Sequence, residues 1–246
     1  MRLNRFLSSR GLGARRKCDD FIHQGRVTVN STIVVESGLQ VNEEQDLIEV
    51  NGMPVKRSPR PVYLLMNKPA DYVVTVTDPQ ERRTVFDLLK GLEERVFPVG
   101  RLDMDVDGVL IFTNDGDLAH RLIHPRYTVE KTYHVVVQGK PDRETVRAVE
   151  EGLPLDGGLT APVTVTLLSS DGRTSHLEQT MHEGRKRQVK RMWTYVGHPV
   201  IKMTRIGFAG LTSDGLEPGQ WRRLRVDEID RLKNTVRLES REIWPA

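Results

Sequence analysis

The sequence predicts an α+β fold in two parts. A small α/β module with its linker occupies residues 1–60, and a larger, mainly antiparallel mixed-sheet domain occupies residues 61–246. Two observations support this prediction. Helical and alternating apolar patterns follow one another after residue 61 without the regular strand–helix order of a parallel sheet, which indicates the α+β class. The charged, proline-rich segment 56–61 separates the two parts, as linkers do.

The first part contains two short helical patterns and three short strand patterns. Leu3, Phe6 and Leu7 have helical spacing, which the glycines at 11–13 interrupt. A second helix is expected at residues 14–24, with an apolar face formed by Cys18, Phe21 and Ile22. Strands are expected at residues 26–30, 32–35 and 47–50. A module of this size buries little apolar surface and is only marginally stable. We therefore expect it to serve a binding role.

The second part contains more and longer elements. The apolar patterns predict strands at residues 62–67, 73–76, 109–113, 132–137, 163–168 and 176–180. They predict helices at residues 84–92, 118–123, 142–151 and 188–196. Strands and helices in this order favour an antiparallel sheet on which the helices pack.

Positive charge is concentrated in two islands. Residues 1–30 hold seven basic and two acidic residues, and residues 181–205 hold seven basic and one acidic residue. The chain as a whole carries only +3, so the remainder is net acidic. Two basic islands on an acidic body are typical of a protein that binds a polyanion, although either island alone could be an ordinary solvated face.

Other bulk features narrow the class of protein. The single cysteine, Cys18, excludes an internal disulfide and a cysteine-based zinc site, and it fits a reducing cytoplasm. No run of 18 apolar residues predicts a membrane span, and the basic start lacks the apolar segment of a secretory signal. We therefore expect a cytoplasmic protein without a membrane association.

The segment GRLDMDVDGVLIFTNDG, residues 100–116, is the main candidate for chemistry. Arg101 is followed by carboxylates at alternate positions, Asp103, Asp105 and Asp107, and then by Gly108 and a short apolar run. The apolar run reads as a buried strand, so the carboxylates belong to a loop at the edge of a rigid sheet. Binding and catalytic groups concentrate on such loops.

The same letters also fit the start of a helix-flanked calcium loop, D-x-D-x-D-G. The twelfth position of that loop should be a bidentate glutamate, and here it is Asn114. The residues after Gly108 favour a strand instead of a helix. The calcium interpretation is therefore disfavoured, and a plain solvated acidic turn is the third alternative.

The second basic island predicts a rigid basic helix. If the helix begins near Arg187, then Arg187, Lys190 and Arg191 share one face, while Val189, Met192 and Trp193 anchor the other. A fixed basic face suits phosphate contacts or pairing with a carboxylate. On the strand at 132–137, Tyr133 could stack on a base or be ordinary core, and His134 reads as a surface histidine.

Four segments in this order resemble bacterial ribosomal-RNA pseudouridine synthases of the small-subunit and large-subunit single-site group: residues 66–79, 100–116, 130–139 and 183–192. The amino-terminal module resembles the small RNA-binding domain first described in a protein of the small ribosomal subunit, through residues 15–16 and 24–30. The resemblance implies that Asp103 is the catalytic carboxylate, that Tyr133 is the family tyrosine, and that Lys190 pairs with Asp103. It implies no metal and no organic cofactor, and we assign Asp105 and Asp107 no catalytic role.

The chemistry agrees with that implication. Isomerising a uridine breaks a carbon–nitrogen bond and forms a carbon–carbon bond to the same ribose, which needs a carboxylate but no redox partner or group donor. The target base must leave its stack, at a cost of a few kcal/mol. A neighbouring cation such as Lys190 would keep the carboxylate ionised, and Tyr133 could stack on the uracil and assist proton transfer.

The expected partner is ribosomal RNA, bound by a monomer. The expected RNA contacts come from the basic islands and from cations beside the motifs: Arg2, Arg5, Arg15, Arg16, Lys17, Arg26, Lys68, Arg101, Arg185, Arg187 and Arg191. Residues 118–133 and 215–222 resemble the large-subunit enzymes more closely, so we favour large-subunit over small-subunit RNA.

Two other functions remain open. A nucleoside or RNA glycosidase also needs carboxylates at an anomeric carbon, but it would release a free base. A non-enzymatic assembly factor would need only the basic islands. Asp103 favours an enzyme, because a pure RNA binder gains nothing from a carboxylate that repels phosphates.

Overall fold

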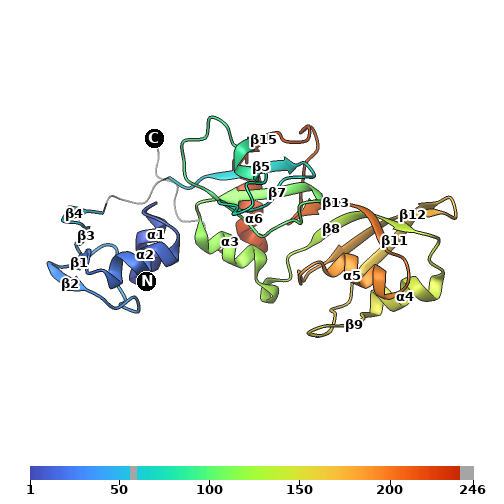
Figure 1. Cartoon of the computed structure of the whole chain (residues 1–246), viewed down its shortest axis with the longest axis horizontal. Coiled ribbons are helices and arrows are strands. Elements are labelled where there is room, and N and C mark those ends of the chain that lie inside the picture. Colours follow the sequence, from blue (N-terminus) through green and yellow to red (C-terminus); the bar gives the residue numbers. More distant parts are fainter. Residues whose placement is uncertain (56–59, 239–246) are drawn as a thin grey trace. The chain divides into compact units, whose positions relative to one another are not determined.

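The chain is described by a computed structural model, which covers residues 1–55 and 60–238. It divides into two units, Met1–Pro61 and Val62–Ala246, which are described separately (Figure 1). Most of the segment expected as a linker, residues 56–61, lies outside the described residues. No described helix is long and apolar enough to cross a membrane.

The first unit is a pair of helices with a small sheet. The helices are α1 (Leu3–Ser9) and α2 (Arg15–His23), and the strands are β1 (Val27–Val29), β2 (Thr32–Val34), β3 (Ile48–Val50) and β4 (Met53–Pro54). The strands form an antiparallel sheet in the order β2-β1-β3-β4. Leu3, Leu7, Cys18 and Ile22 are fully buried in its core, whereas Phe21 is only partly buried. The predicted helices and strands of this module are confirmed.

The second unit contains the larger sheet. Its main strands are β5 (Tyr63–Lys68), β7 (Asp107–Thr113), β8 (Lys131–Gln138), β11 (Thr164–Ser170), β12 (Thr174–Met181), β13 (Val200–Phe208) and β15 (Trp221–Arg223). Shorter strands are β6 (Phe97–Pro98), β9 (Pro154–Leu155), β10 (Gly158–Leu159) and β14 (Leu211–Thr212). The helices are η1 (Val85–Leu88), α3 (Gly116–Ile123), η2 (Pro125–Tyr127), α4 (Arg143–Glu151), α5 (Gln188–Tyr195) and α6 (Val226–Thr235).

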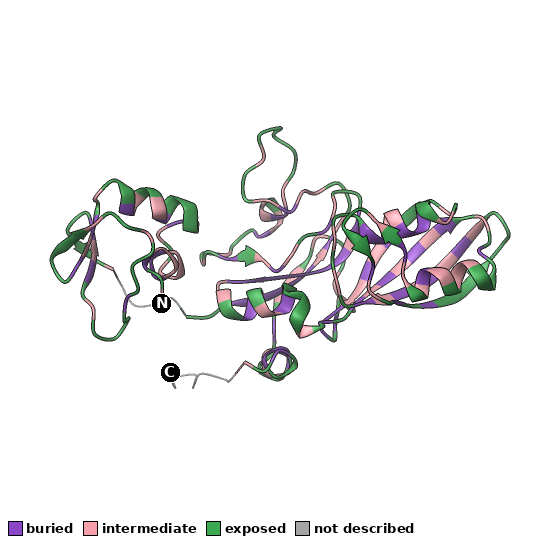
Figure 2. Cartoon of the chain, turned by 90° about the horizontal axis from the view of Figure 1, so that it is seen from below, coloured by how far each residue is buried: buried purple, intermediate pink, exposed green. Residues whose placement is uncertain are grey.

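The large sheet runs in the order β11-β12-β8-β13-β7-β5-β15, with β14 beside β13 and β6 beside β7. Among the described residues its pairs are antiparallel except β13 with β7. One core packs α4 and α5 against the sheet, and a second packs α3 and α6 (Figure 1). Buried residues follow the strands, and the outer sides of the helices are exposed (Figure 2). The predicted α+β class with a mainly antiparallel sheet is confirmed.

Several predicted elements were wrong or missed. The strand expected at residues 73–76 is a loop with a single bridge from Val73 to Thr84, because Val74 alone is buried there and Val76 is 64% exposed. The helix expected at residues 84–92 is only the single 3-10 turn η1. Strands β13 and β15 and helix α6 were not predicted. Charged residues interrupt the apolar pattern of β13, yet tertiary packing places this strand in the middle of the sheet.

Gly108 makes the parallel contact between β7 and β13 possible. It pairs with Arg205, and its φ of +107° belongs to a region that side chains disfavour. A Cβ atom on Gly108 would lie 2.2 Å from the carbonyl oxygen of Arg205. The backbones therefore meet closely just where the acidic loop joins the sheet.

We predict that Gly108→Ala destabilises the protein by about 3 kcal/mol or more, since it adds backbone strain to a steric clash. The free energy of unfolding can be measured by denaturant titration. Gly215→Ala is the control, because Gly215 also has a positive φ, +77°, but has no atom within 4 Å of the added Cβ. Equal losses in the two variants would show that β13 tolerates displacement at Gly108.

Candidate active site

The acidic loop lies between β6 and β7, at residues 99–106. Leu102 and Val106 are buried and fix its two sides to the core. The amide of Val106 donates to the carbonyl of Asp103 at 3.1 Å, which closes a tight turn. Asp103 and Asp105 project from this turn, with side chains 34% and 61% exposed. The loop thus presents two carboxylates from a backbone held by its apolar neighbours.

Lys68 holds the same loop from inside. Its side chain is fully buried at the end of β5, and its ammonium donates to the carbonyls of Pro69 (2.9 Å), Met104 (3.2 Å) and Val106 (2.7 Å). Burial lowers the pKa of Lys68 from 10.5 to about 8, and the nearby carboxylates oppose that shift. The prediction that Lys68 contacts RNA was wrong, because this ammonium is enclosed by backbone oxygens.

Helix α5 brings a second cation to the loop. The ammonium of Lys190 lies 2.6 Å from both carboxylate oxygens of Asp105 and 3.7 Å from Oδ2 of Asp103. The hydrogen bond from Lys190 lowers the pKa of Asp105. The expected approach of Lys190 to Asp103 is therefore present, but the closer partner is Asp105, for which the sequence suggested no role.

Buried residues fix the position of α5. Val189, Met192 and Trp193 pack in the core, and the indole of Trp193 donates to Oε1 of Gln179 on β12 at 2.8 Å. Arg187 precedes the first turn in a left-handed conformation, φ +52°. The helix can therefore hold Lys190 over the acidic loop with little freedom, as the sequence predicted from its apolar face.

Tyr133 lies on β8 in the core beneath α5. It is 8% exposed and belongs to the same packed cluster as Leu102 of the acidic loop and Val189 of α5. The three residues expected to act together, Asp103, Tyr133 and Lys190, thus come from segments that share one core. His134 points to the other face of the sheet, where its ring stacks on that of His176 at 5.2 Å.

Arg205 is a functional candidate that the sequence analysis missed. It is 3% exposed on β13, in register with Tyr133 on one side and Gly108 on the other. Its Nε donates to the carbonyl of Val109 at 2.8 Å, and Tyr133 is its neighbour in register on β8. A charged residue inside an apolar strand pattern was the available signal, because a buried cation needs partners.

The other predicted RNA contacts fall into two groups. In the second unit Arg101 and Arg187 are exposed, Arg191 pairs with Asp156 at 3.0 Å, and Arg185 donates to backbone carbonyls of the β9–β10 turn. In the first unit the exposed cations are Arg2, Arg15, Arg16, Lys17 and Arg26, and Arg5 is partly buried. Lys17 and Arg26 lie over the ring of Phe21.

The calcium-loop interpretation does not fit this geometry. Strands β6 and β7 flank the acidic loop where a helix–loop–helix site needs helices. The carboxylate of Asp105 is already engaged by Lys190. Among the described residues, no group of three histidine, cysteine or carboxylate side chains is arranged to hold a metal ion.

Comparisons with known proteins agree on one family. Residues 62–195 match the family described as RNA pseudouridylate synthase, and residues 1–47 match the S4 domain. The chain is 42% identical over 240 residues to an uncharacterized RNA pseudouridine synthase of Aquifex aeolicus, covering 97% of this chain and 96% of that one. It is also 42% identical over 234 residues to the ribosomal large subunit pseudouridine synthase B of Bacillus subtilis, covering 94% and 95%.

A solved structure described as a pseudouridylate synthase has a similar fold. It superposes with a TM-score of 0.68 at 28% identity, covering 94% of this chain and 99% of that one. The matched part includes residues of both units, the small amino-terminal module as well as the large sheet.

We predict that Lys68→Met changes how the free energy of unfolding depends on pH. The folded state releases the Lys68 proton near pH 8, whereas the unfolded chain keeps it up to the ordinary pKa of 10.5. Between these values the unfolded chain binds more protons, so Lys68 makes wild-type stability rise with pH. Denaturant titrations from about pH 7 to about pH 10.5 should therefore show the wild type gaining stability relative to Lys68→Met.

Lys131→Met is the comparison, because burial also lowers the pKa of Lys131 to about 8 but its ammonium donates to Val129 and His182 instead of the acidic loop. Only Lys68→Met should also speed hydrogen exchange at the amide of Val106. A stability difference that does not change with pH would mean that Lys68 stays charged in the folded protein.

Proposed function

The chain belongs to the RNA pseudouridylate synthase family, and we propose that it isomerises a specific uridine of ribosomal RNA with Asp103 as the catalytic carboxylate. The observation that carries the assignment of Asp103 is the ammonium of Lys190, 3.7 Å from Oδ2 of Asp103 and itself only 12% exposed. Asp103 keeps a third of its side chain open, which a substrate needs in order to reach it.

The reaction requires three things of these residues. Asp103 attacks the ribose or abstracts a proton from it, so that the bond between the sugar and N1 of uracil breaks. Lys190 compensates the negative charge of the acidic loop while the RNA backbone approaches. The small exposed part of Tyr133 contacts the uracil as it turns, and Tyr133 assists the loss of the proton from C5 after the carbon–carbon bond has formed.

Asp105 has a supporting role in this proposal. It binds Lys190 through both oxygens and holds the ammonium within reach of Asp103. Its own side chain is 61% exposed, which suits a residue that orients a cation better than one that attacks a flipped base. We assign Asp105 no step in bond making or breaking.

The amino-terminal S4 module supplies affinity for the RNA. Its exposed arginines and lysine contact phosphates and position the substrate without reading its sequence. Unstacked bases in a loop or bulge of a folded RNA element then determine which uridine enters the site. We propose that the protein does this as a cytoplasmic monomer, in agreement with its single buried cysteine.

Large-subunit ribosomal RNA is the preferred substrate in this proposal. The relative from Bacillus subtilis that is named as a ribosomal large subunit enzyme matches over 94% of this chain. A second protein with that name, from Vibrio vulnificus, is 34% identical over 243 residues. The segments 118–133 and 215–222 point the same way.

Asp103→Asn should lower the rate of pseudouridine formation by about a thousandfold or more, because loss of a catalytic carboxylate removes several orders of magnitude in rate. Asp105→Asn removes the same charge from the same loop, and it should retain activity within about tenfold, because its amide oxygen can still accept from Lys190 and the Asp103 carboxylate is kept. Tritium release from C5-labelled RNA measures both rates. Activity of Asp103→Asn above about a tenth of wild type would overturn the assignment of the carboxylate.

Purified protein incubated separately with naked large-subunit and small-subunit RNA should modify one uridine in the large-subunit RNA. Mapping of pseudouridines in both products measures this directly. Poly-uridine, which lacks a folded element, should remain unmodified. Modification confined to the small-subunit RNA would reverse the choice of substrate, and binding without any product would favour the assembly-factor alternative.

A further inference from the structure

A groove adjoins the proposed active site on the far side of Lys190. It has a volume of about 430 Å³, within the range of small-molecule sites. Helix α5 forms one wall through Arg187, Lys190, Arg191 and Tyr195, and residues 154–156 of the β9–β10 hairpin form the other. Lys190 lines the groove and also contacts the acidic loop. An RNA strand bound in the groove can therefore continue into the active site.

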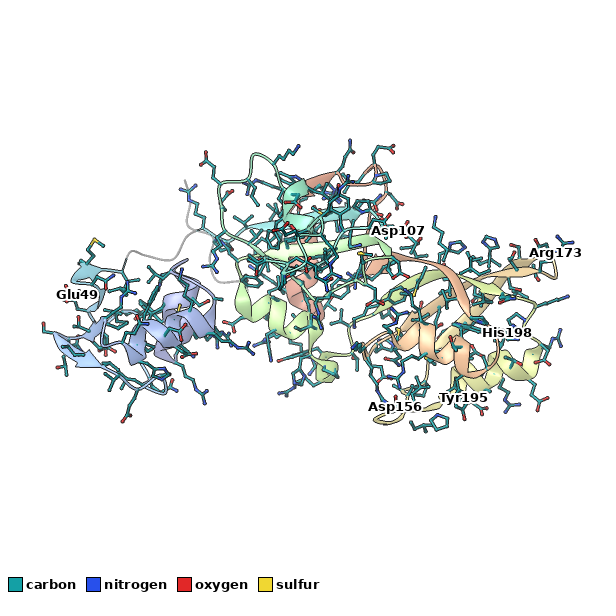
Figure 3. The ribbon with its side chains drawn as sticks, in the orientation of Figure 1. Glu49, Asp107, Asp156, Arg173, Tyr195 and His198 are labelled. Atoms are coloured by element: carbon teal, nitrogen blue, oxygen red, sulfur yellow. The ribbon has the colours of Figure 1, made fainter. Side chains whose placement is uncertain are left out.

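The helix wall combines positive charge with an aromatic ring. Arg187 is exposed, Arg191 is partly exposed, and Tyr195 is 57% exposed at the last residue of α5. An open aromatic ring beside two arginines is the usual arrangement for single-stranded nucleic acid, where bases stack and phosphates pair with cations. Tyr195 and Asp156 face this groove from opposite walls and lie near each other in Figure 3.

The hairpin wall is held in place by its own contacts. Arg185 donates to the carbonyls of Gly157, Gly158 and Leu159, and Glu183 accepts from the amide of Ala161 at 2.9 Å. Since Arg185 precedes α5 in the chain, these bonds tie the hairpin to the start of that helix. The groove therefore exists before RNA binds.

Asp156 is the one acidic side chain in the groove wall. It is fully exposed, and it pairs with Arg191 at 3.0 Å. An exposed ion pair contributes little to stability, about 1 kcal/mol or less. A phosphate can therefore take the place of the Asp156 carboxylate on Arg191 at small cost, although the negative charge of Asp156 opposes its arrival.

We propose that this groove binds the nucleotide next to the target uridine in the substrate strand, with its base stacked on Tyr195 and its phosphate between Arg187 and Arg191. The inference rests on the proposed function, since it places RNA in the adjoining site. Tyr195 is five residues from Lys190, about 7.5 Å along the helix, which is the scale of one nucleotide. Asp156 weakens this subsite and so limits its affinity.

Four variants test the subsite by kinetics on the ribosomal RNA that the wild type modifies. Tyr195→Ala should raise KM by about fivefold to a hundredfold with kcat unchanged, because the lost stacking is a binding contribution. Tyr195→Phe should behave as wild type. Asp156→Asn should instead lower KM, because it removes the negative charge that opposes the phosphate. Arg191→Gln should raise KM and reduce the dependence of binding on log salt by about one unit.

Two matched controls remove the same charges elsewhere in the second unit. Arg173→Ala removes an exposed arginine at the far β11–β12 turn, and Glu144→Gln removes an exposed carboxylate from α4. Neither should change KM by more than about twofold, because neither lines the groove. Filter binding of large-subunit RNA to each variant in an Asp103→Asn background repeats the comparison without turnover.

The outcomes separate the subsite from the function itself. If the wild type forms pseudouridine but Tyr195→Ala and Asp156→Asn match their controls in KM and in filter binding, the subsite is wrong and the function stands. If Tyr195→Ala lowers kcat at unchanged KM, the subsite is also wrong. If the wild type forms no pseudouridine, the function fails, and filter binding alone decides whether the groove holds RNA.

Discussion

The buried ammonium of Lys68 is the contact on which the site depends. A loop with two carboxylates, followed by a third at the start of β7, has no strong tendency to stay folded against a sheet, because the charges repel one another and favour water. Lys68 supplies a positive charge inside the sheet and binds the carbonyls of Met104 and Val106. It therefore fixes the backbone that carries Asp103 and Asp105 while it partly compensates their charge. Burial of an uncompensated ammonium would be costly, so the cation and the acidic loop stabilise each other.

The cations around the loop differ in burial, and burial separates their roles. Lys68 and Arg205 are enclosed by backbone and core and can only position other groups. Lys190 is nearly buried but reaches both carboxylates, and its hydrogen bond lowers the pKa of Asp105. Arg187, directly before α5, is exposed, and Arg191, directly after Lys190, is partly exposed and pairs with Asp156; both positions suit contact with phosphates. Helix α5 and the residue before it thus present cations to both the acidic loop and the groove.

The acidic loop creates a difficulty for an RNA enzyme, since carboxylates repel phosphates. The structure places the neutralising cations around the loop and leaves Asp103 in reach of Lys190 on one side and open on the other. Strand β13 completes the arrangement, because Arg205 binds the backbone of β7 through Val109 and lies in register with Tyr133 of β8. The close approach at Gly108 allows those strands to lie side by side. The chemistry therefore depends on a contact between backbones as much as on the charged residues.

The sequence by itself determined the α+β class and the elements with strong apolar periodicity, because local patterns carry that information. Its short motifs made Asp103, Tyr133 and Lys190 candidates for the site. It identified α5 as a rigid basic helix, since Val189, Met192 and Trp193 mark its buried face. Only the tertiary structure decided that Lys68 is internal, that Asp105 takes the closest contact with Lys190, and that β13 with Arg205 lies in the middle of the sheet. The burial and partners of a charged side chain depend on segments distant in the chain, and no local pattern records which of those segments will meet.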